Sequence, residues 1–313
     1  MLGSSAGRLY WMFRNLERCE NTARLLEAGL RLGLTRSSNR SDDWKSVITS
    51  AGASLNFLER HDEFGSEQVI DFLLCDSSHP GSVLSSIEGA RTNARIVRTA
   101  LTREVWEATN EAWMSLTGLL TEPLDVRDLS HVLAHVRQES ANVRGALHGT
   151  MMRNDIYDFC RLGTFVERAD NTARILDVKY YLLLPSADQV GSRLDNVQWE
   201  NILRSISAQR AYRWRNPGAM NPRDIADFVI FDRRMPRSLA FCFSKISDRL
   251  AYLGTAYDQR HPSHDRAEAL KGRLGSSDIA AVFDSGLHEF LQGCINDTAA
   301  LGQQIETDYQ FAI

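Results

Sequence analysis

The sequence contains few residues that break helices and almost no pattern that predicts a β-strand. Only seven prolines occur in 313 residues, and none interrupts a long periodic segment. Alternating apolar and polar residues bounded by turn dipeptides are nearly absent. Apolar residues instead recur at helical spacing, as in the stripe formed by Leu16, Cys19, Ala23, Leu26 and Leu30. These patterns predict an all-α protein.

The signature motifs of common cofactor and nucleophile sites are also missing. The sequence has no GxGxxG, no P-loop and no GxSxG. Its five cysteines are widely spaced, odd in number and without a CxxC pair. This cysteine pattern argues against a disulfide framework and against a zinc site, and it suits a reducing compartment. We therefore expect no cofactor and no metal.

Charge and hydropathy argue against two further classes of partner. The net charge is −4 and the isoelectric point about 6.1, so no bulk basic field favours nucleic acid. The N-terminal stretch MLGSSAGRLYWMFRNLER lacks the apolar run of a signal peptide. The most apolar run, residues 180–184, is too short to cross a bilayer. These features predict a cytoplasmic protein that contacts neither nucleic acid nor a membrane.

Helical periodicity and end signals predict a long first helix over 4–33, with Gly33 as its stop. Asp128 and Ser277 are the expected N-caps of two later helices. Polar loops are expected at 36–42 and 185–192. The remaining expected helices cover 42–60, 66–75, 80–101, 103–121, 129–153, 155–184, 193–213, 222–231, 236–255, 264–274 and 277–311.

One charged octad occurs twice. Residues 17–24 read ERCENTAR and residues 167–174 read ERADNTAR, so six of eight letters match and Glu20 against Asp170 keeps a carboxylate. On a helix the acids, the asparagine and the last arginine of each octad share one face, opposite an apolar stripe. The residues of interest in the two copies are Glu17, Arg18, Glu20, Asn21, Arg24, Glu167, Arg168, Asp170, Asn171 and Arg174.

Other landmarks repeat in the same order as the octads. Trp44 matches Trp199 at an offset of 155 residues, and FLLCD at 72–76 matches FVIFD at 228–232 at an offset of 156. Pro80 and Ser82 match Pro236 and Ser238 at that same offset. These matches predict two tandem repeats, 1–150 and 151–313, that form one helical bundle with pseudo-two-fold symmetry. The two octads should then face each other across the axis.

Three interpretations of the octads remain open. They can form a solvated face, in which Glu20 with Arg24 and Asp170 with Arg174 are weak i,i+4 pairs. They can instead form a buried network of ion pairs that fixes the register of the helices. Finally, they can line a polar cleft that holds a ligand or supplies an acid and a base.

Two weaker clusters lie outside the octads. Arg91 and Arg95 share a helical face with Glu88, with Asn93 nearby, and the corresponding positions of the second half lack this cluster. It can be an anion site confined to the first half or an ordinary solvated basic face. His131, His135 and Glu139 are spaced i, i+4, i+8 and could place three ligands on one side of a helix, but no second helix supplies a partner.

Three stretches together resemble the alpha-E family of α-helical bacterial proteins. They are YWMFRNLERCENTARLLE, HPGSVLSSIEGARTNARIVR and LGTFVERADNTARILDVKYYL. The family is named for a Glu-Arg motif and typically occurs as a tandem duplication. In this resemblance Glu17-Arg18 and Glu167-Arg168 are the two copies of the signature pair. The resemblance is clear from Met1 to about Leu184 and more diffuse beyond.

The resemblance implies a role beside other proteins. Members are associated with circularly permuted ATP-grasp ligases, transglutaminase-like proteins and a proteasome-like peptidase, in a proposed peptide synthesis or modification system. We expect a non-catalytic helical component that binds or positions an ATP-grasp-type ligase or its peptide product. The alternative is an enzyme that acts on peptide-like amide bonds through a cleft of acids and arginines from both octads.

Overall fold

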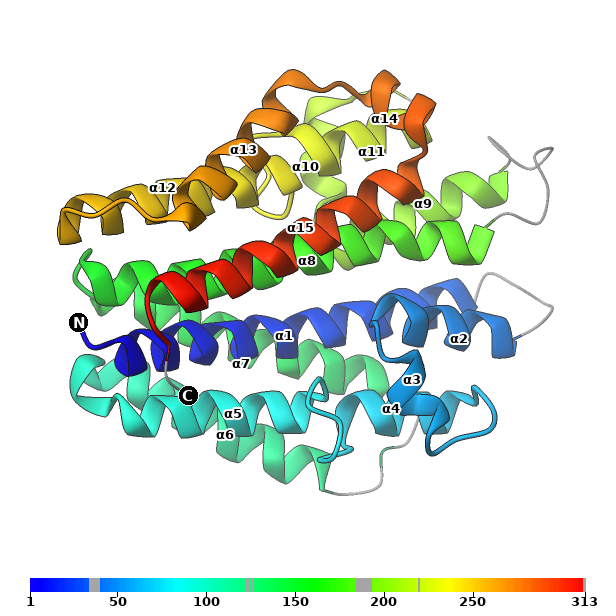
Figure 1. Cartoon of the computed structure of the whole chain (residues 1–313). Helices are drawn as coiled ribbons and strands as arrows, with labels where there is room; N and C mark the ends of the chain where they lie inside the picture. The colour runs from blue at the N-terminus through cyan, green and yellow to red at the C-terminus, as the bar shows by residue number, and fades with distance from the viewer. Residues whose placement is uncertain (34–39, 122–123, 125–126, 184–192, 219, 312–313) are drawn as a thin grey trace.

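The computed structural model describes residues 1–33, 40–121, 124, 127–183, 193–218 and 220–311 (Figure 1). In this part of the chain the structure contains helices and no strands, which confirms the predicted all-α class. The helices are α1 (Gly3–Gly33), α2 (Arg40–Ser50), α3 (Ser54–Leu58), α4 (Ser66–Leu74), α5 (Val83–Ile96), the 3₁₀ turn η1 (Arg98–Ala100), α6 (Arg103–Leu120), α7 (Leu129–Thr150), α8 (Asp155–Leu183), α9 (Arg193–Ser205), α10 (Gln209–Arg215), α11 (Pro222–Phe231), α12 (Leu239–Tyr257), α13 (Pro262–Ser276), α14 (Ile279–Ser285) and α15 (Leu287–Asp308).

Three predicted helices are each broken in two. The breaks fall at Gly52, Ser207 and Gly286, whose φ angles are +70°, +55° and +95°. A residue with positive φ cannot continue a right-handed helix. The predictions of single helices over 42–60, 193–213 and 277–311 are therefore wrong at these points.

Several predicted ends also differ. Asp128 makes no side-chain cap, and Asp278, not Ser277, caps α14 by accepting a hydrogen bond from the backbone N–H of Ala281. Residues 40–42 begin α2 and are not part of a loop. The rest of the expected loop at 36–42, and the one at 185–192, lie outside the described residues. Helix α1 extends as far as Gly33, and the residues that would test Gly33 as its stop lie outside the described part of the chain.

Helices α1 and α8 lie side by side at the centre of the bundle and run in the same direction (Figure 1). Helices α5 and α7 pack against α1, and α12 and α15 pack against α8. Contacts also cross between the halves, because α2 touches α8 and α9 touches α1. The predicted halves 1–150 and 151–313 are thus packed directly against each other along the central pair. Their origin by duplication stays a prediction.

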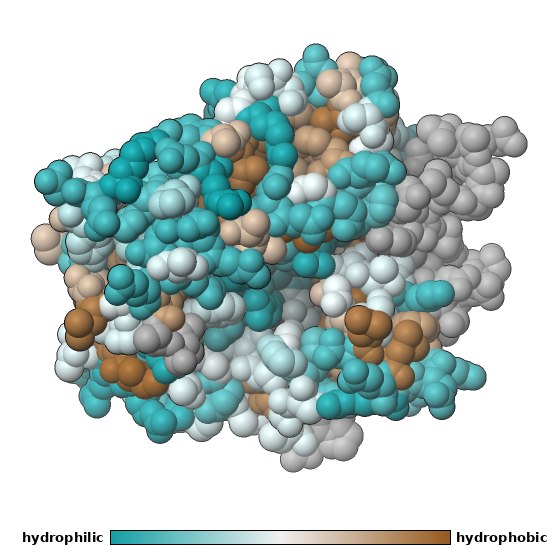
Figure 2. Space-filling model, in the orientation of Figure 1, coloured by the Kyte–Doolittle hydropathy of each residue, from teal (hydrophilic) through white to brown (hydrophobic). Residues whose placement is uncertain are grey.

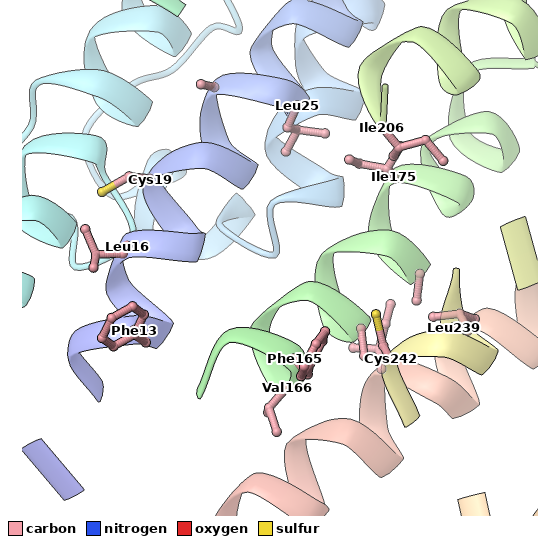
Figure 3. Packing of buried hydrophobic residues seen from close by; sticks show 14 of the residues in the cluster. Phe13, Leu16, Cys19, Leu25, Phe165, Val166, Ile175, Ile206, Leu239 and Cys242 are labelled. Carbon is pink, nitrogen blue, oxygen red and sulfur yellow. The ribbon is translucent and has the colours of Figure 1, made fainter. Parts of the chain in front are cut away.

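Apolar side chains join each central helix to the helices of its own half. Figure 3 shows Leu16 and Cys19 on the side of α1 that faces away from α8, and Phe165 and Cys242 where α8 meets α12. All four are buried to 1% exposure or less. The opposite faces of α1 and α8, which carry the octads, are therefore turned toward each other.

Gly163 permits the close approach of α1 and α8. A Cβ atom at this position would lie 2.1 Å from the backbone oxygen of Tyr10 and 3.2 Å from the backbone nitrogen of Arg14. Both contacts involve backbone, so no side-chain rotation can relieve them. The central helices can keep their spacing only with glycine at this position.

We expect Gly163→Ala to lower the free energy of unfolding by about 1–3 kcal/mol, the range found for overpacked cores. Gly145→Ala is the matched control, because Gly145 also lies inside a helix but has nothing within 4 Å of its would-be Cβ. That control should be neutral or stabilising, since alanine favours helix over glycine. Urea unfolding of both variants measures the difference; equal stability would contradict the role assigned to Gly163.

Candidate functional site

The Glu-Arg pairs of the two octads bind each other reciprocally. Arg168 on α8 holds both oxygens of Glu17 on α1, with Nε and Nη2 each 2.8 Å from an oxygen. Arg18 on α1 holds both oxygens of Glu167 on α8, at 2.6 Å and 3.0 Å. These are bidentate, charge-assisted pairs, the strongest geometry available to arginine and carboxylate. The octads therefore meet across the central helix pair.

Most of the octad residues are buried. Glu17 and Glu20 are 1% exposed, Glu167 6% and Arg168 7%. The interpretation of the octads as a solvated face is therefore wrong for these residues. A buried carboxylate needs a paired cation, and the reciprocal bonds supply one for each half.

Further arginines from outside the octads complete the network. Arg237, just before α12, lies 3.0 Å from Glu17 and 2.5 Å from Glu20. Arg144 on α7 pairs with the same two carboxylates, and Arg14 on α1 donates to Glu167 at 2.9 Å. Sequence reasoning missed Arg144 and Arg237, because Arg144 lies outside the repeated stretches and the position that matches Arg237 in the first half is Gly81.

The arginines keep the buried carboxyl groups ionised. Burial by itself would raise the pKa of Glu167, but the charges of Arg18 and Arg14 outweigh burial and lower this pKa to about 2. Burial and the charge of Glu17 would raise the pKa of Glu20, but the charges of Arg237 and Arg144 lower it to about 2. The pKa of Glu17 is held well below its ordinary value in the same way. A carboxyl group that stays ionised at neutral pH cannot donate a proton as a general acid.

The last arginine of each octad makes matching contacts in the two halves. Arg24 pairs with Glu20 and donates to the backbone oxygen of Ser205 at 2.7 Å. Arg174 pairs with Asp170 and donates to the backbone oxygen of Ser50 at 3.5 Å. These arginines thus tie each octad to the C-terminal end of α9 or α2.

The threonine of each octad repeats this correspondence. Thr22 donates to the backbone oxygen of Gly81 and Thr172 to that of Arg237. The two acceptors are 156 residues apart, the offset at which Pro80 and Ser82 match Pro236 and Ser238. Equivalent contacts at equivalent positions are what a duplication would produce.

A polar pocket opens on one side of this network. It has a volume of about 220 Å³ and is lined by residues of α1, α4 and α8, by Ala51 just after α2, and by the segment before α5. In the view of Figure 2 the surface is hollowed along the level at which α1 and α8 run. The octad residues that line the pocket are Arg18, Asn21, Thr22, Glu167, Asp170, Asn171 and Arg174. The other charged octad residues, Glu17, Glu20, Arg24 and Arg168, are not among those that line it.

The pocket offers unused hydrogen-bonding capacity. Asn171 is half-buried, and its side chain has no hydrogen-bond partner among the described residues. Among the described residues Asp170 pairs only with Arg174, whereas its counterpart Glu20 pairs with three arginines. Burial lowers the pKa of His79, and the charges of Arg18 and Arg60 lower it further against the opposing charge of Asp76. The pocket can therefore hold a polar ligand group without disturbing the network behind it.

The second polar cluster lies elsewhere. Arg91 stacks on Trp113 and donates to Asn110, both on α6. Asn93 accepts a hydrogen bond from Arg8 at 3.2 Å, and Arg95 is exposed. None of these residues lines the octad pocket.

The histidine and cysteine patterns form neither a metal site nor a disulfide in the part of the chain that the structure describes. No group of three or more metal-binding side chains comes together there. His135 contacts Glu139 at 3.4 Å, while His131 is exposed. The five cysteines are free. No helix in the described part combines the length and the apolar character that crossing a bilayer needs.

Comparison with known families identifies the fold described above. The model of Alpha-E, described as a predicted alpha-helical domain with a conserved ER motif, matches residues 1–310. The chain belongs to the Alpha-E family. This match confirms the resemblance seen in the sequence. In this chain the two Glu-Arg dipeptides of the octads form the reciprocal ion pairs described above.

Uncharacterised mycobacterial proteins are the curated relatives of this Alpha-E chain. One protein of Mycobacterium bovis and two of Mycobacterium tuberculosis strains are each 24% identical to it over 258 residues. The match covers 76% of this chain and 28% of each relative, so the chain spans less than a third of their length. No solved structure matches the chain.

We expect Arg168→Ala to destabilise the Alpha-E fold by about 3 kcal/mol, because removing one partner of a buried ion pair leaves a carboxylate less compensated. Glu17 keeps Arg144 and Arg237, which limits the loss. Arg103→Ala is the control, since its pair with Glu107 is exposed and such pairs contribute little. Denaturant unfolding provides the measurement, and a loss no larger than that of the control would refute a stabilising network.

The low carboxyl pKa values also predict the pH dependence of stability. A group whose pKa is 4.5 when unfolded and about 2 when folded stabilises the protein above pH 4.5. That stabilisation disappears as the pH falls through the folded value. We expect the free energy of unfolding to fall between about pH 5 and pH 2. Glu167→Gln should flatten the slope, and an unchanged slope would show that Glu167 is not held in this way.

Proposed function

We propose that this Alpha-E protein is a non-catalytic helical component of a bacterial peptide synthesis or modification system. In this proposal the octad pocket binds an ATP-grasp-type ligase or its peptide product, and a transglutaminase-like protein is the second possible partner. The observation that carries the proposal is the pocket itself. Seven polar octad side chains border a space of about 220 Å³, while Glu17, Glu20, Arg24 and Arg168 of the network do not line it.

The organisation of the relatives supports a role alongside other protein segments. In the mycobacterial relatives the matched region is 28% of a longer chain. A helical unit that is joined to further chain in its relatives is well suited to positioning another domain or its product. The parallel pair α1 and α8 gives such a unit a rigid centre, since both helices are packed on several sides.

The alternative of an enzyme acting on peptide-like amide bonds has less support from the geometry. Glu167 in the pocket has a pKa of about 2, and both of its carboxylate oxygens accept hydrogen bonds from arginines. Such a group is a poor acid and a weak base at neutral pH. A binding role uses the same side chains as fixed charges and needs no proton transfer.

Asn171→Leu provides the test of the binding role. This change fills part of the pocket with an apolar group of similar size and breaks no hydrogen bond among the described residues. We expect it to weaken the binding of a purified ATP-grasp-type ligase or transglutaminase-like protein from the same organism by about tenfold or more. The thermal unfolding temperature should stay close to that of the wild type. Isothermal titration calorimetry measures the affinity.

Asn296→Leu on α15 is the matched control, because Asn296 is exposed and does not line the pocket. Equal binding by Asn171→Leu and the wild type would place the partner surface elsewhere. If neither protein binds the wild type, the proposed partners are wrong. Cleavage or transfer of a peptide amide by the purified chain, lost in Asp170→Asn, would overturn the non-catalytic role.

A further inference from the structure

The octad pocket corresponds to a place beside Glu17, Glu20 and Asn21 of the first octad. The side chain of Arg237 fills that place. Arg237 is 7% exposed. Its Nη1 lies 3.0 Å from Glu17 Oε1 and 3.2 Å from Asn21 Oδ1, and its Nη2 lies 2.5 Å from Glu20 Oε1. Three acceptors of one octad thus surround a single guanidinium.

The same three acceptor positions border the octad pocket. Glu167, Asp170 and Asn171 correspond to Glu17, Glu20 and Asn21, and all three line it. The position that corresponds to Arg237 at the offset of 156 is Gly81, which also lines the pocket. The pocket therefore occupies the place that the missing side chain would fill.

Among the differences between the polar contacts of the two halves are those that Arg237 makes. Glu17 Oε1 accepts a hydrogen bond from Arg168 Nε and forms an ion pair with Arg237 Nη1 at 3.0 Å, whereas Glu167 Oε1 contacts Arg18 Nε alone among the described residues. Asn21 Oδ1 accepts from Arg237, and Asn171 accepts from nothing in the described chain. A carboxylate oxygen and an amide oxygen can each accept two hydrogen bonds. The acceptors that would hold a guanidinium are thus in place and unfilled.

We propose that this pocket receives the guanidinium group of an arginine side chain presented by the peptide or partner protein. This inference rests on the proposed function, which it deepens by naming the chemical group that is bound. Arginine fits better than lysine, because a planar fork of donors can reach Glu167, Asp170 and Asn171 together, as Arg237 reaches their counterparts.

The charges around the two places are consistent with this ligand. The filled place brings together two carboxylates and four arginines, namely Glu17, Glu20, Arg24, Arg144, Arg168 and Arg237. The octad pocket has two carboxylates and three arginines around it, namely Glu167, Asp170, Arg14, Arg18 and Arg174. A guanidinium bound in the pocket would bring its set to two carboxylates and four cations, the same as in the other half. The fold already accommodates that combination of charges around Glu17 and Glu20.

Calorimetric titration of the full chain with N-acetyl-arginine methylamide tests the inference, with the citrulline analogue as the uncharged probe of the same shape. We expect the arginine probe to bind and the citrulline probe to bind about tenfold or more weakly, since hydrogen bonds between charged groups are the strong ones. Free agmatine serves as a third probe. Its binding alone, without that of the arginine amide, would indicate a small metabolite instead of a protein side chain.

Rebuilding the missing side chain within the chain provides the matched variant. Gly81→Arg introduces the guanidinium, and His79→Met removes the imidazole whose Nε2 would lie 2.8 Å from a Cβ at position 81. Because Met235 precedes Arg237 at the corresponding position, the double variant copies the second half. It should lose binding of the arginine probe. Gly272→Arg adds the same charge at an exposed glycine with open space and should bind as the wild type.

Equal binding of the arginine and citrulline probes, or undiminished binding by the double variant, would overturn the inference. So would the absence of any arginine binding at millimolar concentration. If inorganic phosphate or an acidic peptide binds instead and Asn171→Leu blocks it, the guanidinium assignment is wrong while the proposed binding function stands. If, in addition, Asn171→Leu binds the partner protein as tightly as the wild type does, the guanidinium assignment and the proposed binding function of the pocket are both wrong.

Discussion

Glu17 and Glu167 lie on neighbouring buried helices, and the arginines bound to each come from other helices or loops. A carboxylate removed from water is costly unless a cation and further hydrogen bonds compensate it. Arg168 and Arg18 provide this compensation across the gap between α1 and α8. The two central helices are thereby fixed in register, because sliding one past the other would break both bidentate pairs together.

This constraint explains why the surrounding helices lie where they do. The apolar faces of α1 and α8 point away from the shared interface and pack against α5 and α12. Gly163 brings the two backbones close enough for the ion pairs to form. The last arginine of each octad then donates to a backbone oxygen at the C-terminal end of α9 or α2, and the threonine donates to one just before α5 or α12. One set of residues therefore positions both the helix ends and the polar pocket.

Much of this could be predicted from the sequence, and the failures have identifiable causes. Periodicity located the helices, and the repeated octads pointed to a meeting of acids and arginines. The breaks at Gly52 and Ser207 were missed because a turn of positive φ leaves the apolar spacing on either side almost unchanged. Arg237 and Arg144 were missed because their role depends on tertiary contact alone. The octad repeat shows only the part of the network that both halves share.

The two halves differ at one position beside the octads, where Arg237 corresponds to Gly81. The pairs Glu17 with Arg168 and Glu167 with Arg18 use residues present in both octads, so they meet the structural need symmetrically. Arg237 closes one side further, and Gly81 leaves the other side open. Stability alone would favour closing both sides, because unpaired acceptors gain from a donor. The acceptors beside Gly81 are the feature on which the proposed binding of a guanidinium from outside the chain rests.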